Sequence, residues 1–532
     1  MNGPKEQLPL LKKEEPSVDV RSEFLQLVSM ALQVSLSTFA RIALISIDSA
    51  FLGHLGTKEL AASSLAVIWT EVPFNSAWAG ATALITLCGQ AWGAKNYELV
   101  GIWLQMGVVV MTVLAVPVVV WHWCVGVVLE LSTDDIEVVR LGERFARIVS
   151  FTVWPALMYA CVRHYFQSMG IMTPTTVVGV LSIGVAASAN YILIFGAYGW
   201  GGLGFDGSPL ASVIASWFQP IALISYCILY KKMHLRAWTG WRGESFTAER
   251  LKTYLKITAP ISANSFVTTI SNSAMALIAA RMGADAIAAN AVISGLWNLL
   301  WALFWGFGCA TQVRVANHLG ANHPNAAMIL ARMGLICSVA CVLLLGLATL
   351  CLNRRVYMVY TSDDNLLNLC VLVQPIFVTA FIIESIEITI SSILTAMGEV
   401  NITARTGTIA TWCVELPLAY VGCVHLGLGF PMLWYSIVVM EVCKVMVYSF
   451  ALVRVDWQFM AQRAVETMEM AGETEQVTTD ESDSLNLAIS EAVSTPLTHI
   501  ATVHSPLAAL VTPTSRPKVW EPVYENNNVH VP

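Results

Sequence analysis

The chain has 532 residues, of which 56% are hydrophobic and only 12% are charged, and its formal net charge is −7. Water-soluble proteins carry about 25% charged residues, so this composition excludes a water-soluble fold. It predicts an all-α integral membrane protein whose surface mostly faces lipid.

The order of apolar stretches predicts five parts. Residues 1–22 form a polar N-terminal tail, and no cleavable signal peptide is expected. Six helices form an amino lobe at 23–230, a basic loop follows at 231–256, and six more helices form a carboxyl lobe at 257–453. Residues 454–532 are rich in Ser, Thr, Glu and Pro and predict a disordered tail. The twelve expected helices, each able to cross a core of ~30 Å, are 25–53, 63–88, 100–125, 145–169, 175–196, 209–230, 257–281, 287–312, 327–351, 370–397, 407–425 and 430–453.

Basic residues are concentrated on one side of the expected helices. They lie in the N-terminal tail, in the 231–256 loop and in the short connections that hold Lys95, Arg314 and Arg405. Because cytoplasmic loops carry the excess of Lys and Arg, both termini are expected to be cytoplasmic.

The two halves of the chain repeat each other. Gly56 and Gly93 recur 227 positions later as Gly283 and Gly320, with similar residues between them. A repeat of this length in a membrane chain predicts two homologous six-helix lobes, the arrangement with which transporters alternate access around a central site.

Two acids in the amino half are candidates for function, because ionisable groups inside a membrane are expensive. Asp48 lies in the first expected helix and can exchange protons or bind a cation. The alternative is a structural ion pair with Arg41, seven positions earlier on the same helical face. Glu71 precedes Pro73 in the second expected helix, and its role stays open between function and structure.

Three acids in the carboxyl half are further candidates. Glu384 and Glu387 are three residues apart on one helical face and close enough to share a proton. Glu415 lies in the eleventh expected helix, where the repeat sets it opposite Asn190 of the fifth. The two halves therefore carry matched polar positions that suit a central cavity.

Two further patterns allow a functional and a structural interpretation. Glu441 and Lys444 are one turn apart, and we interpret them as an ion pair without a transport role. Trp297, Trp301 and Trp305 recur every four residues. Such a face would suit aromatic cations if it lined a cavity, and packing toward lipid is the alternative.

Several site types are not indicated by the sequence. It holds no P-loop, no nucleotide fingerprint and no zinc-type spacing among its twelve cysteines. These observations argue against an ATP-driven pump and against an enzyme. We expect no cofactor, no metal, no nucleic-acid partner and a monomeric chain.

Four different short motifs lie at the ends of expected helices. They are Phe51-Leu-Gly-His-Leu-Gly56 with Glu59-Leu-Ala-Ala62, Leu87-Cys-Gly-Gln-Ala-Trp-Gly-Ala-Lys-Asn96, Arg163-His-Tyr-Phe-Gln-Ser168 with Pro174, and Arg314-Val-Ala-Asn-His-Leu-Gly-Ala321. Together they extend over about 25–455 and resemble the eukaryotic branch of the multidrug and toxic compound extrusion (MATE) family. The resemblance implies two six-helix lobes around a central cleft. It also implies export of organic cations or other xenobiotics in exchange for H⁺ or Na⁺.

The resemblance assigns positions in the amino lobe. Asp48 falls where bacterial members carry their helix-one acid, and Asn190 falls on a helix-five Asn/Asp position. Arg41 departs from the family, which often has Gln there. A cation so close would weaken cation binding unless the two side chains point apart.

The resemblance is incomplete in the carboxyl lobe. Thr268 and Ser273 occupy the positions of the expected helix-seven acid. The helix-ten acid falls on Ile386, which Glu384 and Glu387 only flank. Either Glu415 and these flanking glutamates take over the role, or coupling lies in the amino lobe.

We therefore predict a secondary-active antiporter in the plasma membrane or in a vacuolar or other acidic-organelle membrane, most simply coupled to protons. An exporter of organic anions or secondary metabolites is the alternative suggested by Arg41, and a receptor or scaffold that uses the 454–532 tail is a third. The coupling candidates are Asp48, Glu384, Glu387 and Glu415, and the substrate-cleft candidates are Arg41, Glu71, Asn190, Thr268, Ser273 and Trp301.

Overall fold

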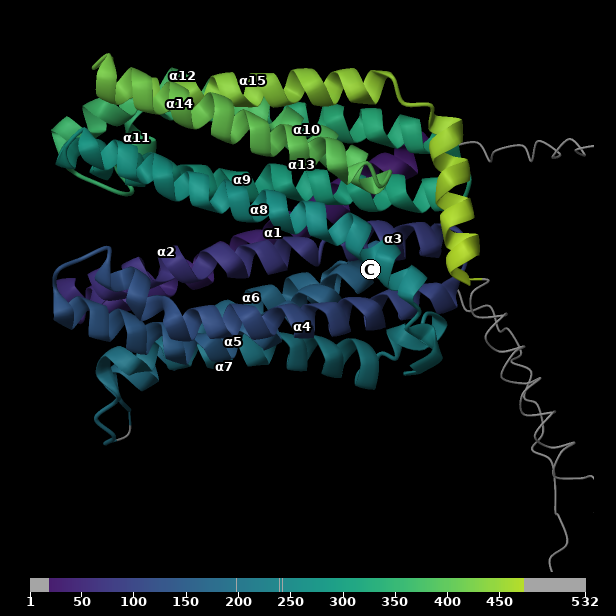
Figure 1. The fold of residues 1–532 in the computed structure, drawn as a ribbon, viewed down its shortest axis with the longest axis horizontal. Coiled ribbons are helices and arrows are strands. Elements are labelled where there is room, and N and C mark those ends of the chain that lie inside the picture. Colours follow the sequence, from purple (N-terminus) through teal and green to yellow (C-terminus); the bar gives the residue numbers. More distant parts are fainter. Residues whose placement is uncertain (1–18, 198, 239, 242, 473–532) are drawn as a thin grey trace, which may run out of the picture. The chain divides into compact units, whose positions relative to one another are not determined.

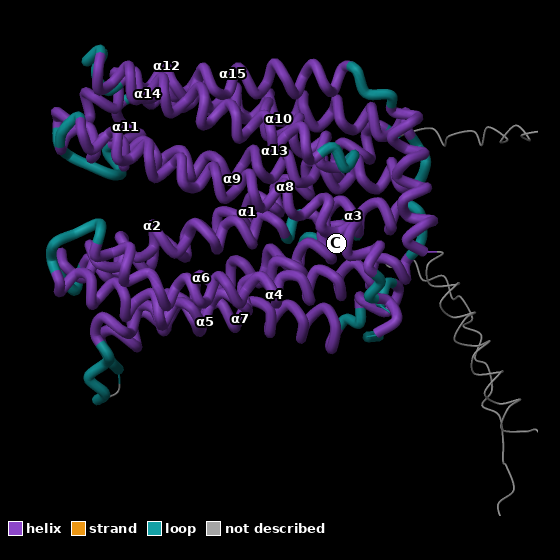
Figure 2. Tube along the Cα trace, viewed as in Figure 1, coloured by secondary structure: helices purple, strands orange, loops and turns teal. Residues whose placement is uncertain are grey.

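The computed structural model describes residues 19–472 except 198, 239 and 242, and this part of the chain is helical without a strand (Figure 2). The N-terminal residues 1–18 and the tail from 473 onward lie outside the described residues. In chain order the elements are α1 (Val20–Gly53), α2 (Thr57–Gly80), α3 (Ala83–Gly93), α4 (Tyr97–Glu130), α5 (Ile136–Ser168), α6 (Thr173–Phe195), η1 (Gly204–Asp206), α7 (Gly207–Ile224), η2 (Ser225–Tyr230), η3 (Met233–Arg236), η4 (Gly243–Ser245), α8 (Ala248–Arg281), α9 (Ala284–Gly320), α10 (Pro324–Leu352), α11 (Arg354–Tyr357), α12 (Asp364–Ala396), α13 (Val400–Ile409), η5 (Ala410–Glu415), α14 (Leu416–Tyr420), η6 (Val421–His425) and α15 (Pro431–Val453).

These elements form twelve membrane-spanning segments. Ten described helical stretches are long and apolar enough to cross a membrane. The consecutive helices α2 and α3, and the 34-residue helix α8, complete the twelve. The expected second helix is broken between α2 and α3, where the Thr82 hydroxyl donates to the Ala79 carbonyl at 2.6 Å. Its counterpart in the repeat, α9, is continuous.

Polar residues at the predicted breaks begin several of these helices. The side chains of Asn96, Asp135 and Asp363 accept hydrogen bonds of 3.1, 2.9 and 2.8 Å from backbone N–H groups in the first turns of α4, α5 and α12. Such caps satisfy N–H groups that have no partner within the helix. The boundaries between the spans therefore follow from the sequence locally.

The helices gather into two lobes (Figure 1). In the amino lobe, α4 packs on α5 and α7 lies between α5 and α6. In the carboxyl lobe, α12 packs on α9, α10 and α15. Between the lobes, α1 packs against α9 and α2 against α8, so the two helix pairs that meet are related by the repeat.

Reciprocal glycines bring the lobes together at one end, which we term the closed end. A Cβ on Gly93 of α3 would lie 1.9 Å from the carbonyl oxygen of Asn317 in α9. A Cβ on Gly320 of α9 would lie 2.0 Å from the carbonyl oxygen of Gln90 in α3. Only glycine permits this approach of two backbones. The two glycines that define the repeat thus perform the same task from opposite lobes.

Hydrogen bonds between the lobes extend from the closed end to the middle of the bundle. At the closed end, Gln90 Nε2 donates to the Ala396 carbonyl at 2.8 Å, and Arg314 pairs with Glu23. Near the middle, the Ser35 hydroxyl donates to the Leu303 carbonyl at 3.2 Å. These contacts fix the lobes against each other over the half of the bundle nearest Gly93.

A helix at 457–472 corrects the expectation of a disordered tail from residue 454. Figure 1 shows it as the yellow helix across the closed end. Ala461 and Ala464 pack in an apolar cluster with α1, α9, α10 and α12, while Met468 and Ala471 pack in a cluster with α3, α4 and α5. The spacing of these four residues places them on one helical face. The segment therefore buries an apolar face, although its overall composition is polar.

Polar contacts hold the same helix to the carboxyl lobe. Arg463 pairs with Glu399, which precedes α13. The Nε of Arg250 in α8 donates to the Ala471 carbonyl at 2.7 Å. The helix therefore contacts both lobes.

Gly93→Ala is expected to destabilise the protein by about 1–3 kcal/mol, because the added methyl group cannot fit against the α9 backbone without moving the lobes apart. Gly184→Ala is the matched control, since a Cβ on Gly184 of α6 meets no atom within 4 Å. Thermal unfolding of the purified chain measures both variants. Equal midpoints for the two would contradict the close approach at the closed end.

Candidate functional site

The amino lobe holds a cavity of about 370 Å³ between α1, α2, α5, α6 and α7. Its walls are mostly apolar, and charged groups from three helices enter it. The polar and aromatic residues that matter below are Arg41, Asp48, Glu71, Trp78, Arg163 and Ser212.

Asp48 is held in this cavity by two donors from other helices. Asn190 Nδ2 of α6 donates to Oδ1 at 2.7 Å, and the Ser212 hydroxyl of α7 donates to Oδ2 at 2.5 Å. Asn190 is completely buried and also donates to the Ala186 carbonyl at 3.0 Å. The structure therefore brings together the two residues that the sequence placed in the first and fifth helices. It adds Ser212, which no motif indicated.

The alternative ion pair between Asp48 and Arg41 is wrong. Seven residues along an α-helix amount to roughly 10 Å of rise, which separates the two side chains. The Arg41 guanidinium lies 5.7 Å from the centre of the Trp78 ring and is attracted by Glu71 on α2. Arg41 and Asp48 thus point to different partners, which removes the objection that the arginine blocks the acid.

Glu71 and Arg163 are the other two charged residues that line the amino-lobe cavity. Glu71 accepts a hydrogen bond of 2.5 Å from Asn75 Nδ2 one turn further along α2. Arg163 of α5 is 4% exposed, and its Nε has no hydrogen-bond partner. Two acids and two arginines therefore face the cavity, and their formal charges balance.

The carboxyl lobe holds a second group of charges, which we term the carboxyl-lobe cluster: Glu384 and Glu387 of α12, Glu415 of η5, and Glu441 and Lys444 of α15. The Lys444 ammonium lies 2.7 Å from Glu441 Oε1 and 3.7 Å from Glu387 Oε1. Glu384 and Glu415 both interact electrostatically with Lys444 and Glu441. Four carboxyl groups thus share one ammonium group inside the bundle.

Glu441 and Lys444 do form the ion pair expected from their spacing, but the pair is not separate from the other acids. All three predicted carboxyl-lobe acids lie within its electrostatic reach. The sequence could not show this because α12, η5 and α15 meet only in the folded bundle. The charge of Lys444 therefore belongs to the whole cluster.

Thr268 and Ser273 were the candidates on α8, but the α8 residue that contacts an acid of the carboxyl-lobe cluster is Ser271. The Ser271 hydroxyl donates to Glu415 Oε2 at 3.5 Å. Ser273 instead donates to the carbonyl of Thr269 within α8 at 3.3 Å, and Thr268 is half-buried. One turn separates Thr268 from Ser271, so the two residues lie on the same face of α8.

The tryptophans of α9 divide between two environments. Trp301 interacts with Glu384 and stacks on Trp305 with ring centres 5.1 Å apart. Trp297 packs on Phe377 and Trp434 at 5.6 and 5.7 Å. Packing therefore explains Trp297, whereas Trp301 borders the carboxyl-lobe cluster.

Within the part of the chain that the structure describes, no group of three or more His, Cys, Asp or Glu side chains is arranged to hold a metal ion. The buried charged groups instead gather in the amino-lobe cavity and in the carboxyl-lobe cluster. Two related six-helix lobes with charges in each are the architecture of a multi-pass membrane transporter.

The MatE family model matches residues 28–192 and 260–421, once in each lobe and over more than half of the chain. The chain belongs to the MatE family of membrane transporters. Its similarity to multidrug and toxin extrusion protein 2 of Mus musculus is 28% identity over 453 residues, covering 84% of this chain and 77% of the relative. Multidrug and toxin extrusion protein 1 of Xenopus tropicalis is 26% identical over 450 residues, with the same coverage.

The fold is also that of solved transporter structures. The eukaryotic MATE transporter AtDTX14 superposes with a TM-score of 0.75 at 20% identity, covering 84% of this chain and 100% of that chain. This match confirms the predicted all-α fold of twelve membrane helices, and the family match confirms the resemblance.

The two donors to Asp48 predict a measurable coupling between side chains. A double-mutant cycle of Asp48→Asn and Asn190→Ala is expected to give a coupling energy of about 1–2 kcal/mol, because the bond has a charged acceptor. The control cycle of Asp48→Asn with Arg41→Gln is expected to give less than about 0.5 kcal/mol. Unfolding of the purified variants measures both, and a larger coupling in the control cycle would contradict the geometry.

Proposed function

We propose that this transporter exports organic cations or related xenobiotics in exchange for protons. The observation that carries the proposal is the carboxyl-lobe cluster, in which four carboxyl groups share one ammonium group within an apolar bundle. Buried carboxylates need compensating positive charge, which a proton or an organic cation can supply. The relatives named above are multidrug and toxin extrusion proteins, which supports the same substrate class.

Exchange follows if the two kinds of cation exclude each other. A proton that neutralises an acid removes the charge that held the organic cation, so binding one ion favours release of the other. Asp48 can act in the same way in the amino lobe, since its two hydrogen bonds hold the carboxyl group in one orientation. Such a ligand moves the lobes only if it binds one conformation better than the other.

The basic connections support a cytoplasmic closed end. Lys95 follows α3 and Arg314 lies near the end of α9, both beside the contact of Gly93 with Asn317. With this orientation both termini are cytoplasmic. The described conformation then faces outward, toward the outside of the cell or the lumen of an organelle, and the plasma membrane and an acidic organelle are both compatible.

Protons suit the carboxyl-lobe cluster better than Na⁺. A sodium ion needs several oxygen ligands around one point, while the Lys444 ammonium already occupies the space beside Glu441 and Glu387. Proton transfer to a carboxyl group needs no such shell. We therefore favour protons as the coupling ion.

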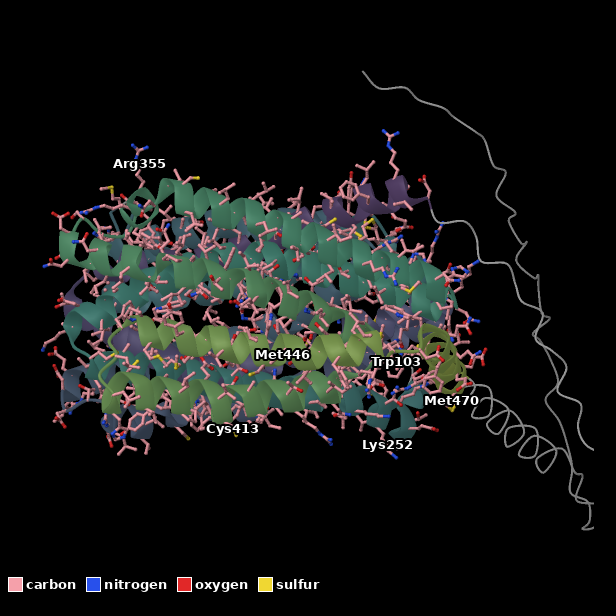
Figure 3. All side chains as sticks on the ribbon, turned by 90° about the horizontal axis from the view of Figure 1, so that it is seen from above. Trp103, Lys252, Arg355, Cys413, Met446 and Met470 are labelled. Carbon is pink, nitrogen blue, oxygen red and sulfur yellow. The ribbon has the colours of Figure 1, made fainter. Side chains whose placement is uncertain are left out.

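The test is uptake of a fluorescent organic cation into proteoliposomes under an imposed pH gradient. We expect the gradient to drive accumulation by the wild-type chain and Asp48→Asn to reduce it at least about tenfold, because the amide cannot exchange a proton. Arg355→Gln is the control, since Arg355 projects away from the bundle (Figure 3). Accumulation that ignores both a pH gradient and a Na⁺ gradient would overturn the proposal. Retained accumulation in Asp48→Asn would leave the coupling to the carboxyl-lobe cluster alone.

Export of organic anions is the second candidate, because Arg41 and Arg163 both face the amino-lobe cavity. On this hypothesis Arg41→Gln is expected to lower anion transport several-fold and to raise cation transport, since it removes one of the two positive charges there. Paired uptake of a fluorescent anion and a fluorescent cation measures the ratio. An unchanged ratio would contradict the anion hypothesis.

A further inference from the structure

Lys444 has two unequal contacts in the carboxyl-lobe cluster. Its ammonium is 2.7 Å from Glu441 on the same helix and 3.7 Å from Glu387 on α12. All three side chains are largely buried, with 14%, 4% and 10% of the side chain exposed for Lys444, Glu441 and Glu387. The lysine is therefore anchored by Glu441 and only loosely held by Glu387.

The cluster has unused capacity for positive charge. Oε2 of Glu384 and Oε2 of Glu441 are buried and have no hydrogen-bond partner. Glu415 has the Ser271 hydroxyl as a donor, at the long distance of 3.5 Å. Since buried charges need partners, these carboxyl groups attract a further cation.

The two acids of α12 and a neighbouring tryptophan offer suitable groups for an organic cation. Glu384 and Glu387 are one turn apart on α12, and Trp301 of α9 interacts with Glu384. A carboxylate pair beside an aromatic face suits a monovalent cation with an apolar surface, through both charge and cation–π attraction. The Lys444 ammonium borders this position, 3.7 Å from Glu387 Oε1.

We propose that Lys444 is a tethered competitor of the transported cation. Its ammonium occupies the position beside Glu387 when the site is empty, and an incoming monovalent organic cation displaces it while Glu441 retains it. The lysine then returns as the substrate leaves, so the acids do not remain uncompensated. This inference rests on the proposed cation specificity and adds to it a residue that sets the affinity and assists release.

The test measures binding of tetraphenylphosphonium to the purified full-length chain by isothermal titration calorimetry. Lys444→Met is expected to bind it about tenfold more tightly than the wild type, because one competing charge is gone. Lys444→Gln is measured alongside, since its amide can still donate to Glu441 and preserve the local packing. Both are expected to tighten binding and to slow turnover in proteoliposomes.

Three further variants serve as controls. Lys444→Arg keeps the charge and is expected to bind as the wild type does. The double variant Glu441→Gln with Lys444→Met restores the net charge of the cluster and is expected to return toward wild-type affinity. Lys252→Met removes an exposed lysine near the start of α8 (Figure 3) and is expected to leave the affinity for tetraphenylphosphonium unchanged.

Equal, weaker or undetectable binding in both Lys444→Met and Lys444→Gln would overturn the inference. Parallel export assays separate it from the proposed function. If the Lys444 variants bind the cation more tightly but a pH gradient drives no export, Lys444 remains a competitor and the proposed proton coupling is overturned. Export driven by a pH gradient with unchanged affinity in the variants would overturn the competitor alone.

Discussion

The cost of placing charged groups inside an apolar bundle is the constraint on which the rest of this structure depends. The amino lobe meets it by balance: Asp48 receives two hydrogen bonds, and Arg41 faces Glu71 and Trp78. The carboxyl lobe meets it only in part, because Lys444 serves four glutamates. On the proposed function, that imbalance is what attracts cations to the carboxyl lobe.

The repeat explains where the charges stand. In the amino lobe the acid Asp48 is on the first helix, and its partner Asn190 is on the fifth. In the carboxyl lobe the order is exchanged: Glu415 lies in the fifth span of that lobe, and the hydroxyl of Ser271 lies in the first. The same helix contact thus holds a carboxylate and a neutral polar group in both lobes. A duplicated scaffold keeps the geometry while the chemistry on each side diverges.

The sequence predicted those parts of the fold and site that depend on strong local signals. Long apolar runs and the glycine repeat predicted the twelve helices and the two lobes, and carboxylates in apolar runs identified Asp48 and Glu415 as candidates. Ser212 and Ser271 could not be predicted, because serine is common in helices and gains meaning only from a partner on another helix. The helix at 457–472 was missed because its apolar face consists mainly of small residues.

The contacts at the closed end determine what any change of access must break. The backbones of α3 and α9 touch through Gly93 and Gly320, so the lobes cannot slide there without losing close packing. The 457–472 helix contacts both lobes and is tied to α8 through Arg250. Opening this end therefore requires the helix to leave one lobe or to move as a unit with it. Because its apolar contacts are divided between two clusters, the 457–472 helix links the two lobes at the closed end.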